Sequence, residues 1–355
     1  MVMKASVLTK LNAPLVVADI AMPESLAYGQ VAVKILVSGI CGAQLQEIRG
    51  EKGNAAFLPH LLGHEGCGIV DSIGEGVTRV KPGDKVVLHW RKATGIEAAC
   101  PAYGWWRKPG SEASDRAMSR LSVGGGRVTT LSEYTVASEN RLTPVPMDTP
   151  VELCALLGCG LSTALGTIES EAAVKFGESV LIVGTGGLGC NLIRCACMAK
   201  ANPVVAVDVH ANKKRVALSL GATRYVDSSQ EDLSKIGRFD VVIDTAGAGD
   251  SMEKTLPLLS PSGRFIMVGQ PGPGKSVSML NARHMFEGEG KSIKATQGGG
   301  FRPERDIPRY VRMWKAGVLS IDGIITARLP LRQINKGIDM VIAGKASRVL
   351  IDMTL

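Results

Sequence analysis

Cysteine and histidine side chains in three separate glycine-rich segments have the chemistry to bind a metal ion. Cys41 follows a run of β-branched residues, His64 and Glu65 stand together in the run GHEGCGIV, and Cys159 lies in the run LLGCGLST. Two thiolates and one imidazole are the protein ligands of an open catalytic zinc site, whose fourth position is left to water or substrate. Spacing alone does not show that these segments meet, and a single cysteine is more often a small buried residue. The residue types therefore raise the hypothesis of a catalytic zinc.

A glycine-rich loop later in the chain has the pattern of a dinucleotide-binding site. The run Gly184-Thr185-Gly186-Gly187-Leu188-Gly189 reads G-x-G-x-x-G between a predicted strand and a predicted helix. Its glycines allow a tight turn, close approach of a pyrophosphate and packing of helix on strand, and the helix N-terminus offers N–H groups to the phosphates. Asp208, 19 residues after Gly189, would accept hydrogen bonds from the adenosine ribose and favour NAD over NADP. An ordinary tight turn is the alternative, but strand, helix and acid together favour the dinucleotide.

The elements that must hold these residues change in character along the chain. The first 150 residues contain short strands with Gly and Pro turns, among them Gln30–Ile40 and 85–88, and predict a β-rich domain. Residues 91–127 show no clear period, so we expect a long lobe or loop there. From residue 179 strands alternate with helices, which predicts a parallel sheet with right-handed crossovers. The expected strands are 179–183, 204–209, 240–244, 264–268 and 292–296. Three helices are expected: one that follows the glycine loop and ends near residue 200, one over 213–220 and one around 307–314.

Length and composition limit the class of protein. The 355 residues are 45% hydrophobic and carry a net charge of +8, and their 42 glycines show no three-residue period, which excludes collagen. The length suggests two domains. We find no signal-peptide pattern after Lys4, and no apolar run approaches the ~20 residues of a membrane helix. The eight scattered cysteines fit reduced thiols better than a disulfide framework. We therefore expect a cytoplasmic protein with no membrane segment.

These motifs, in this order, resemble the zinc-dependent medium-chain alcohol dehydrogenases. The run GHEGCGIVDSIGEGV over residues 63–77 is similar to the zinc signature of that family, and Cys41, the Gly158-Cys159-Gly160 run, the glycine loop with Asp208 and the segment 299–348 match in order. The resemblance covers nearly the whole chain and is weakest over residues 91–127. It implies an α/β protein in which a GroES-like, β-rich catalytic domain (1–158 and 299–355) accompanies a Rossmann domain with a doubly wound parallel sheet (159–298).

The resemblance also implies a role for individual residues. It places the catalytic zinc ligands on Cys41, His64 and Cys159, with Glu65 close to the metal. It places Thr163 beside the nicotinamide, and Lys213 and Arg348 at the adenosine ribose and the pyrophosphate, although Lys213 alone could equally be a solvated helix lysine. Trp90 and Leu131 are expected to line the substrate pocket, with His89 beside Trp90. A plain strand histidine is the alternative for His89, because one histidine near a pocket is weak evidence.

The chain departs from this family where alcohol oxidation needs a proton path. Family members usually carry Ser or Thr two residues after the first cysteine and often a His farther on, whereas this chain has Ala43 and Gln46. Neither side chain transfers a proton at neutral pH. Gln44 stands where an aspartate usually supports the zinc histidine, so it would make His64 less basic as a ligand. Three explanations stay open: water or a neighbouring substrate hydroxyl carries the proton, another side chain such as His89 replaces the relay, or ordinary alcohol oxidation is lost.

A second zinc site and a basic lobe are the remaining questions of the sequence. The four-cysteine structural zinc site of many family members is not expected, because residues 91–127 contain only Cys100; we expect one zinc per chain. The same residues carry seven Lys and Arg against three Asp and Glu, a net charge of +4, with Trp105 and Trp106 among them. An anionic substrate is one interpretation of this lobe. A solvated loop is the favoured one, because charge runs are usually solvated faces.

The leading hypothesis is a zinc- and NAD-dependent dehydrogenase that transfers a hydride between a small-molecule alcohol or carbonyl compound and NAD. A polyol or sugar-like alcohol is the guess for the substrate, because a vicinal hydroxyl could replace part of the lost relay. The alternative is an NAD-binding sensor or scaffold without dehydrogenase activity. Nucleic-acid binding has no motif to support it. The resemblance implies a homodimer or homotetramer joined through Rossmann-domain strands.

Overall fold

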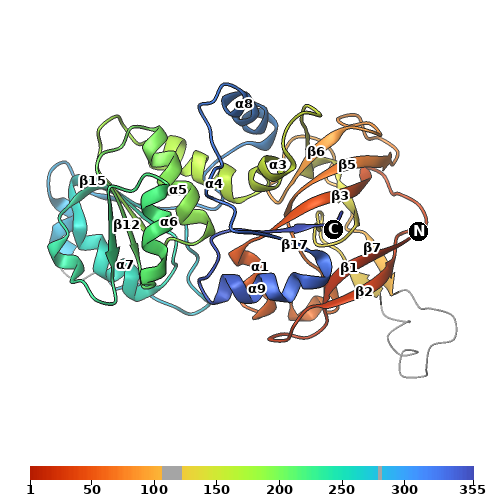
Figure 1. Cartoon of the computed structure of the whole chain (residues 1–355), viewed down its shortest axis with the longest axis horizontal. Coiled ribbons are helices and arrows are strands. Elements are labelled where there is room, and N and C mark those ends of the chain that lie inside the picture. Colours follow the sequence, from red (N-terminus) through yellow and green to blue (C-terminus); the bar gives the residue numbers. More distant parts are fainter. Residues whose placement is uncertain (106–121, 279–281) are drawn as a thin grey trace.

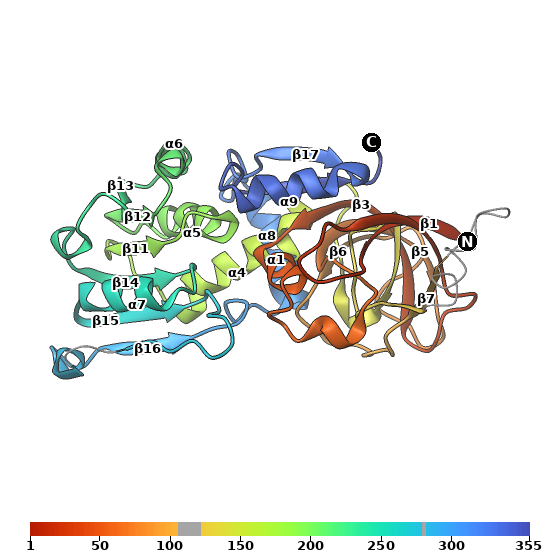
Figure 2. The same ribbon diagram turned by 90° about the horizontal axis from the view of Figure 1, so that it is seen from below.

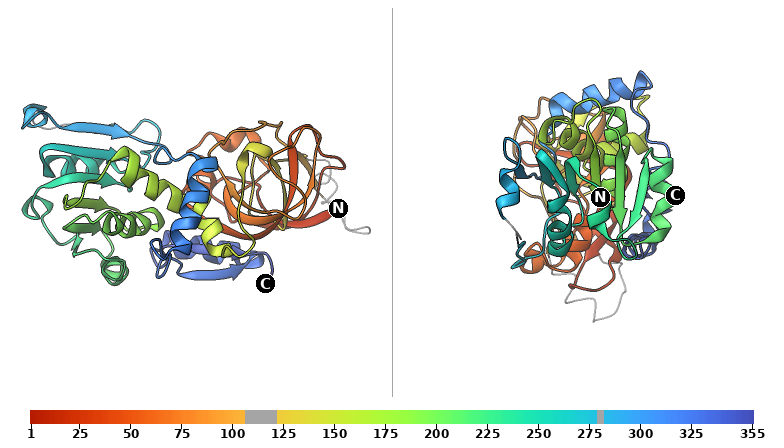
Figure 3. Two further views of the ribbon diagram at one scale, coloured as in Figure 1. Left: turned by 90° about the horizontal axis from the view of Figure 1, so that it is seen from above. Right: turned by 90° about the vertical axis from the view of Figure 1, so that its left-hand side faces the viewer.

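The chain folds into two lobes that lie side by side, with the N-terminal third in one lobe and the middle of the chain in the other (Figure 1). The computed structural model describes residues 1–105, 122–278 and 282–355. Helices α4 and α8 lie at the junction of the lobes, and the C-terminal segment returns to the N-terminal lobe (Figure 3). Any site between the lobes therefore takes residues from distant parts of the sequence.

The N-terminal lobe consists of a closed barrel and a seven-stranded sheet. The barrel strands, in the order β1-β2-β7-β8-β4, are β1 (Val2–Leu8), β2 (Val16–Ala21), β7 (Ala102–Trp105), β8 (Ser122–Gly124) and β4 (His60–Leu61). The sheet contains β10 (Leu142–Pro144), β6 (Lys85–His89), β5 (Glu65–Ile73), β3 (Gln30–Ile40), β18 (Val349–Asp352), β17 (Ala327–Pro330) and β9 (Tyr134–Ser138). Because β18 pairs with β3, the C-terminus completes the lobe that the N-terminus begins.

The second lobe is a six-stranded parallel sheet in the order β13-β12-β11-β14-β15-β16 (Figure 2). Its strands are β11 (Val180–Val183), β12 (Val204–Asp208), β13 (Arg224–Asp227), β14 (Phe239–Asp244), β15 (Leu259–Met267) and β16 (Ser292–Ala295). The strand order reverses direction between β11 and β14, and ligands of such sheets bind in the crevice beyond the carboxyl ends of the strands at that switch point.

Helices and short turns connect these strands. The helices are α1 (Gly42–Ile48), α3 (Val151–Leu157), α4 (Gly160–Gly166), α5 (Gly187–Met198), α6 (Lys214–Ser219), α7 (Gly249–Thr255), α8 (Pro303–Lys315) and α9 (Ile334–Ile342). A π-helical turn, Thr167–Glu171, continues α4. The 3₁₀ turns are Asn54–Phe57, Glu139–Arg141, Ala211–Lys213, Leu233–Lys235, Leu256–Leu258, Ala282–Phe286 and Leu331–Gln333.

The parallel sheet is buried on both faces, as its sequence requires. Successive side chains of a strand point to opposite faces, and β11 shows this directly. Val180 and Ile182 join a core that includes α5 and α8, whereas Leu181 and Val183 join a second core that includes Met252 of α7. Because both faces are covered, all four residues of β11 must be apolar, which is why the strand reads as a continuous hydrophobic run.

The structure confirms the predicted fold class and corrects three of its details. Strands and helices lie where the alternating pattern predicted them, within one or two residues for most, and β15 begins five residues earlier than expected. The sequence analysis missed β13, whose sequence RYVD has a charged residue at each end. Residues 91–127 are not wholly a loop, because β7 and β8 close the barrel there. The central part of that stretch, with Trp106 and four of its basic residues (Arg107, Lys108, Arg116 and Arg120), lies outside the described residues.

In the part of the chain that the structure describes, no single helix is both long and apolar enough to cross a membrane. The bent pair formed by α3 and by α4 with its π-helical turn passes the same test of length and composition, at a bend of 58°.

Candidate metal centre and cofactor cleft

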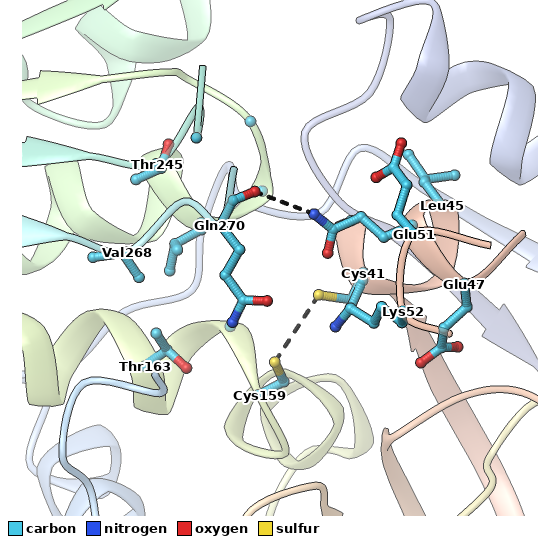
Figure 4. Close-up of a pocket in the computed structure, with 18 of the residues that line it drawn as sticks. Cys41, Leu45, Glu47, Glu51, Lys52, Cys159, Thr163, Thr245, Val268 and Gln270 are labelled. Carbon is cyan, nitrogen blue, oxygen red and sulfur yellow. Dashed lines mark hydrogen bonds between the residues drawn. The ribbon is translucent and has the colours of Figure 1, made fainter. Parts of the chain in front are cut away.

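The structure brings Cys41, His64 and Cys159 together. Cys41 directly follows β3 and is the N-cap of α1, His64 directly precedes β5, and Cys159 lies between α3 and α4. The ligand atoms of these three residues all lie within 4.8 Å of one another, and the two sulfurs are 4.0 Å apart. The thiols point toward one another between the two lobes (Figure 4). Only long-range folding, and not local spacing, assembles this cluster.

The donor set and its spacing fit a tetrahedral zinc. Two thiolates on one tetrahedral zinc, with Zn–S bonds of about 2.3 Å, lie about 3.8 Å apart, close to the distance between these sulfurs. Contact with the Cys159 thiol lowers the pKa of Cys41 well below its usual value, although burial opposes this. Burial disfavours the charged form of His64, but the neighbouring Cys41 outweighs burial and raises the pKa of His64. Cys41 and His64 thus stabilise each other's charged form, and a divalent metal would supply the positive charge that the thiolate needs.

Gln44 connects the first cysteine to the histidine. Its Oε1 accepts the backbone N–H of Cys41 at 2.9 Å, and its Nε2 lies 2.6 Å from Nδ1 of His64. The amide is buried. Because its oxygen already accepts from Cys41, Gln44 presents its NH₂ group to the ring, where an acid would accept a proton. Gln44 therefore orients His64 without adding negative charge.

Glu65 does not face the metal cluster as a free carboxylate. It is fully buried and pairs with the guanidinium of Arg348, at 2.7 Å from Nη1 to Oε1 and 3.0 Å from Nη2 to Oε2. Burial raises the pKa of Glu65, and the charge of Arg348 opposes that rise. The same guanidinium donates to the backbone oxygen of Ile40 at 3.1 Å. This ion pair fastens the C-terminal segment to both metal-binding segments of the N-terminal lobe.

The glycine loop has the shape that a dinucleotide needs. A Cβ on Gly186 would meet no atom within 4 Å, so the loop is open in front of this residue, whereas a Cβ on Gly189 would lie 1.8 Å from the backbone oxygen of Gly184. Gly186 therefore leaves room for a ligand, and Gly189 lets α5 pack on the loop. At the end of β12, Asp208 accepts hydrogen bonds from N–H and Oγ1 of Thr185, each at 2.7 Å, so it also fixes the loop.

A cleft of about 770 Å³ between the lobes contains most of the predicted site residues. Its lining includes Cys41, His64, Trp90, Cys159, Thr163, Gly186, Gly187, Leu188 and Arg348. Glu65, Gly184, Gly189 and Asp208 lie behind or beside this lining. Lys213 is buried and donates to the backbone oxygen of Ala346 at 3.2 Å, and it lines a separate depression of about 370 Å³.

Two residues expected in the substrate pocket lie elsewhere, which corrects that expectation. His89 is fully buried in β6; its Nδ1 lies 2.6 Å from the backbone oxygen of Arg91 and its Nε2 lies 2.9 Å from Oγ1 of Thr143. Burial lowers the pKa of His89 to about 3, so the ring is neutral and does not replace the missing relay. Leu131 packs in the core with Leu8 and Leu62. Both residues lie in strands or turns next to the cleft. Sequence order alone does not show whether a side chain there lines the cleft or packs in the core.

Ala43 and Gln46, which replace the usual proton path, both line the cleft. Nε2 of Gln46 reaches across it to the backbone oxygen of Gln270 at 3.4 Å. The sequence analysis missed Gln270, Thr245 and Val268, which face the metal cluster from the second lobe (Figure 4). Each follows or ends a parallel strand. The position of these strand ends at the switch point was the available signal, because such ends line the crevice of a doubly wound sheet.

In the described part of the 91–127 stretch, basic side chains gather around one acid, Glu97. Glu97 lies within 3.3 Å of the basic groups of Lys92, Arg127 and Arg141. Arg91 donates to the backbone oxygen of Gln297 at 2.8 Å. These contacts hold part of the stretch against the protein, and the interpretation of the whole stretch as a solvated loop stays a prediction.

Comparisons with known proteins identify the class of protein that this fold and site define. The family model for the GroES-like domain of alcohol dehydrogenase matches residues 27–147, and the model for zinc-binding dehydrogenase matches residues 187–315. Together they cover more than half of the chain, which therefore belongs to the zinc-dependent medium-chain alcohol dehydrogenase family. It is an oxidoreductase of the alcohol dehydrogenase type, a class that uses zinc and a nicotinamide cofactor.

Particular relatives extend over the full chain. A probable S-(hydroxymethyl)glutathione dehydrogenase 1 of Schizosaccharomyces pombe is 31% identical over 99% of this chain and 97% of its own length. Benzyl alcohol dehydrogenase of Acinetobacter calcoaceticus is similar in fold, with a TM-score of 0.85 at 23% identity and 99% coverage of both chains. The 2R,3R-butanediol dehydrogenase of Bacillus subtilis has a TM-score of 0.77 at 23% identity and the same coverage.

Proposed function

We propose that this chain is a zinc-dependent dehydrogenase that prefers NAD and oxidises an alcohol with a second hydroxyl group beside the reacting one. The observation that carries the proposal is the cluster of Cys41, His64 and Cys159, whose ligand atoms lie within 4.8 Å of one another. These residues and the glycine loop line the same cleft. Zinc, when bound there, would lower the pKa of a substrate hydroxyl, and the nicotinamide would accept the hydride.

The chain's own residues bind and orient the reactants. The open front of Gly186 and the N-terminus of α5 suit the pyrophosphate. Thr163 and Val268 line the cleft on the side of the parallel sheet, and Trp90 lines it on the catalytic side. These three side chains limit the space beside the metal ligands.

The preference for NAD rests on Asp208. Its carboxylate is held at the end of β12 by Thr185 and by the backbone N–H of His210, at 3.0 Å from Oδ1, and would repel the extra phosphate of NADP. We expect Asp208→Asn, which keeps the size of the side chain, to lower the ratio of kcat/KM for NAD over NADP by about tenfold, a difference of about 1.4 kcal/mol. Steady-state kinetics with both cofactors measure this ratio, and an unchanged ratio would remove Asp208 from the proposal.

The second hydroxyl follows from the missing relay. Ala43 has no group that could hold a proton, and Gln46 is an amide that does not titrate, so the substrate or water must conduct the proton out of the cleft. A vicinal hydroxyl supplies one oxygen of that path and a polar contact for Gln46 or Gln270.

The test is NADH formation by the zinc-loaded chain with matched substrates. We expect 2,3-butanediol to be oxidised with a higher kcat than 2-butanol, and Cys41→Ser to abolish both activities. A chain that holds zinc and NAD but oxidises no alcohol in a broad screen would instead be a non-enzymatic NAD-binding protein. Equal rates for the two substrates would contradict the role of the second hydroxyl.

We also propose that two or more chains associate through the outer edge of β16. All four residues of this strand are exposed, and among the described residues it pairs with β15 alone. An unpaired edge of a parallel sheet is suited to pairing with a second copy. Light scattering coupled to size-exclusion chromatography measures the mass, and a monomer at micromolar concentration would contradict this proposal.

A further inference from the structure

The described lining of the cleft contains a partly buried acid that no step of the proposed reaction uses. Apart from the metal-binding thiols and histidine, the titratable groups of this lining are Glu47, Glu51, Arg49, Lys52, Lys275 and Arg348. The cationic Arg and Lys side chains only donate hydrogen bonds and have no site for a further proton. Glu51 is exposed, whereas Glu47 is partly buried on α1. Glu47 is therefore the group of this set that can accept a proton inside the cleft.

Glu47 lies on the face of α1 where the missing relay would begin. It follows Ala43 by four residues and Gln44 by three, and helix residues at these spacings are neighbours, with about 5–6 Å between Cβ atoms. Ala43 stands in place of the usual hydroxyl group and lines the cleft, and Nε2 of Gln44 lies 2.6 Å from Nδ1 of His64. Glu47 lies on the same side of the cleft as Cys41 (Figure 4). The helix thus places this carboxylate one turn beyond the residues that border the metal ligands.

Charged groups surround Glu47 and leave it able to accept a proton. Burial raises the pKa of Glu47, and it outweighs the positive charges of His64, Lys52 and His60, which lower that pKa. These three groups come from the residue before β5, the turn after α1 and β4. The negative charge of Cys41, at the start of α1, adds to the rise. A raised pKa lies closer to neutral pH, where a general base works best. A carboxylate has about four acceptor sites, so neighbouring cations do not occupy all of them.

We propose that Glu47 accepts the proton of the alcohol hydroxyl through one intervening oxygen and releases it to solvent. The inference rests on the proposed function and names the proton acceptor that Ala43 and Gln46 do not supply. In the oxidation the C–H bond breaks and its hydride goes to NAD. The O–H bond breaks as well, and its proton passes to a water or to the vicinal hydroxyl, which gives a proton to a carboxylate oxygen of Glu47. The exposed turn that carries Glu51 and Lys52 offers the way out to solvent.

The pH dependence of the first turnover tests this role. The zinc-loaded chain is mixed with NAD and 2,3-butanediol in a stopped-flow instrument, and NADH formation is followed over about pH 5 to 9. We expect the rate to rise with pH to a plateau, because only the ionised carboxylate accepts the proton. Glu47→Gln keeps the size of the side chain but cannot accept a proton, so it should lower the plateau rate about 100-fold and remove this rise. Glu47→Asp keeps the carboxylate and should keep the rise.

Two further variants separate proton transfer from a structural role. Glu51→Gln is the matched control, because it makes the same change at an exposed acid of the same lining, and it should leave the rate and the pH profile unchanged. Glu47→Ala opens space for a small carboxylate, so added formate should raise its rate about tenfold by taking over the proton. Formate would not repair a distorted helix.

Two readouts do not depend on turnover. Infrared difference spectra between the native chain and Glu47→Gln, both loaded with zinc and NAD, follow the ionisation of the Glu47 carboxyl group. Its midpoint should coincide with the midpoint of the rate profile. The zinc content and the Kd for NAD of Glu47→Gln should equal those of the native chain, and loss of either would assign Glu47 to binding and overturn the inference.

The outcomes separate this inference from the function beneath it. A Glu47→Gln chain with the native rate and pH profile would overturn the inference and leave the proposed function standing. A slow Glu47→Gln chain that keeps the native pH profile, with no gain of Glu47→Ala from formate, would overturn it as well, because Glu47 would then act only on structure. Failure of the native chain to oxidise any alcohol with zinc bound would overturn the proposed function itself.

Discussion

At the scale of single residues, the metal centre depends on how Gln44 holds His64. The amide oxygen accepts from Cys41, so the NH₂ group meets Nδ1 of His64 at 2.6 Å and favours the ring tautomer whose proton is on Nε2. A metal bound at Nε2 would have to displace that proton. The side chain that usually supports such a histidine accepts from the ring instead and raises its basicity.

Gln44→Glu, which keeps the length of the side chain, should therefore bind zinc more tightly. We expect about a tenfold slower loss of zinc to a chelator, since a lost supporting contact typically changes metal affinity by 10- to 100-fold. Zinc release to a colorimetric chelator at neutral pH measures the rate. Gln46→Glu is the control, because it adds the same charge to α1 on the side that meets Gln270 and not His64. Faster zinc loss from Gln44→Glu than from the native chain would contradict this account.

Residue chemistry made part of the site predictable. Cys41, His64 and Cys159 stand in distinctive glycine-rich runs, and the structure brings them together. His89 and Leu131 could not be assigned correctly, because a residue that lines the cleft and a neighbour that packs in the core differ only in the direction of the side chain. The ion pair between Glu65 and Arg348 joins residues far apart in sequence, and no local sequence pattern predicts it.

At the scale of elements, one buried acid holds the segment that leads toward the cleft. Oε1 of Glu139 accepts the N–H groups of Thr78 and Arg79 at 2.7 and 2.9 Å, and Oε2 accepts that of Ile96 at 2.8 Å. Burial alone would raise the pKa of Glu139, but these three donors outweigh it and lower the pKa. The carboxylate thus connects the segments around residues 78–79 and 96 to the 3₁₀ turn that Glu139 begins.

Glu139→Gln should lower the free energy of unfolding at pH 7 by about 1–3 kcal/mol, the usual range for a charged hydrogen-bond acceptor. The pKa is lower in the folded chain, so the stabilisation is complete above the unfolded pKa and is lost as the pH falls through the folded value. The difference in stability between the native chain and the variant should therefore shrink as the pH falls below the ordinary glutamate pKa of about 4.3. Urea unfolding at several pH values measures it. Glu75→Gln, at an exposed carboxylate nearby, should change stability little, and a gap that widens in acid would contradict the assignment.

Element type was predictable where a strand is apolar throughout. The four-residue run of β11 and the alternation after it predicted the parallel sheet, because a sheet covered on both faces needs apolar strands. The short strands β7, β8 and β13 were missed because, unlike β11, they have no continuous apolar run. Their place in the fold is fixed by partners distant in sequence.

At the scale of the whole molecule, the junction of the lobes is fixed by glycine. Gly298, Gly299 and Gly300 follow β16 with φ of +81°, +65° and +70°. A Cβ on Gly299 would lie 2.3 Å from the backbone oxygen of Thr163 and 2.6 Å from the backbone nitrogen of Thr167, so the chain passes directly against α4 and its π-helical turn. This close passage links the second lobe to the cofactor side of the cleft.

Gly299→Ala should therefore destabilise the chain more than its backbone angle alone explains. A left-handed φ costs an alanine about 1–2 kcal/mol, and overpacking typically adds 1–3 kcal/mol. Gly317→Ala is the matched control, because Gly317 has a φ of +71° but a Cβ there would meet nothing within 4 Å. Urea unfolding of both variants should show the larger loss for Gly299→Ala. Equal losses would mean that the junction is not tightly packed.

The zinc content of the purified chain is the measurement that tests the central claim most directly. Elemental analysis of protein prepared without chelator should give close to one zinc per chain, because Cys41, His64 and Cys159 are the cluster with metal-binding geometry within the described residues. Cys41→Ser should reduce this to near zero, whereas Cys100→Ser, at an exposed cysteine outside the cluster, should leave it unchanged. A native chain without zinc, or a Cys41→Ser chain that keeps its zinc, would contradict the account.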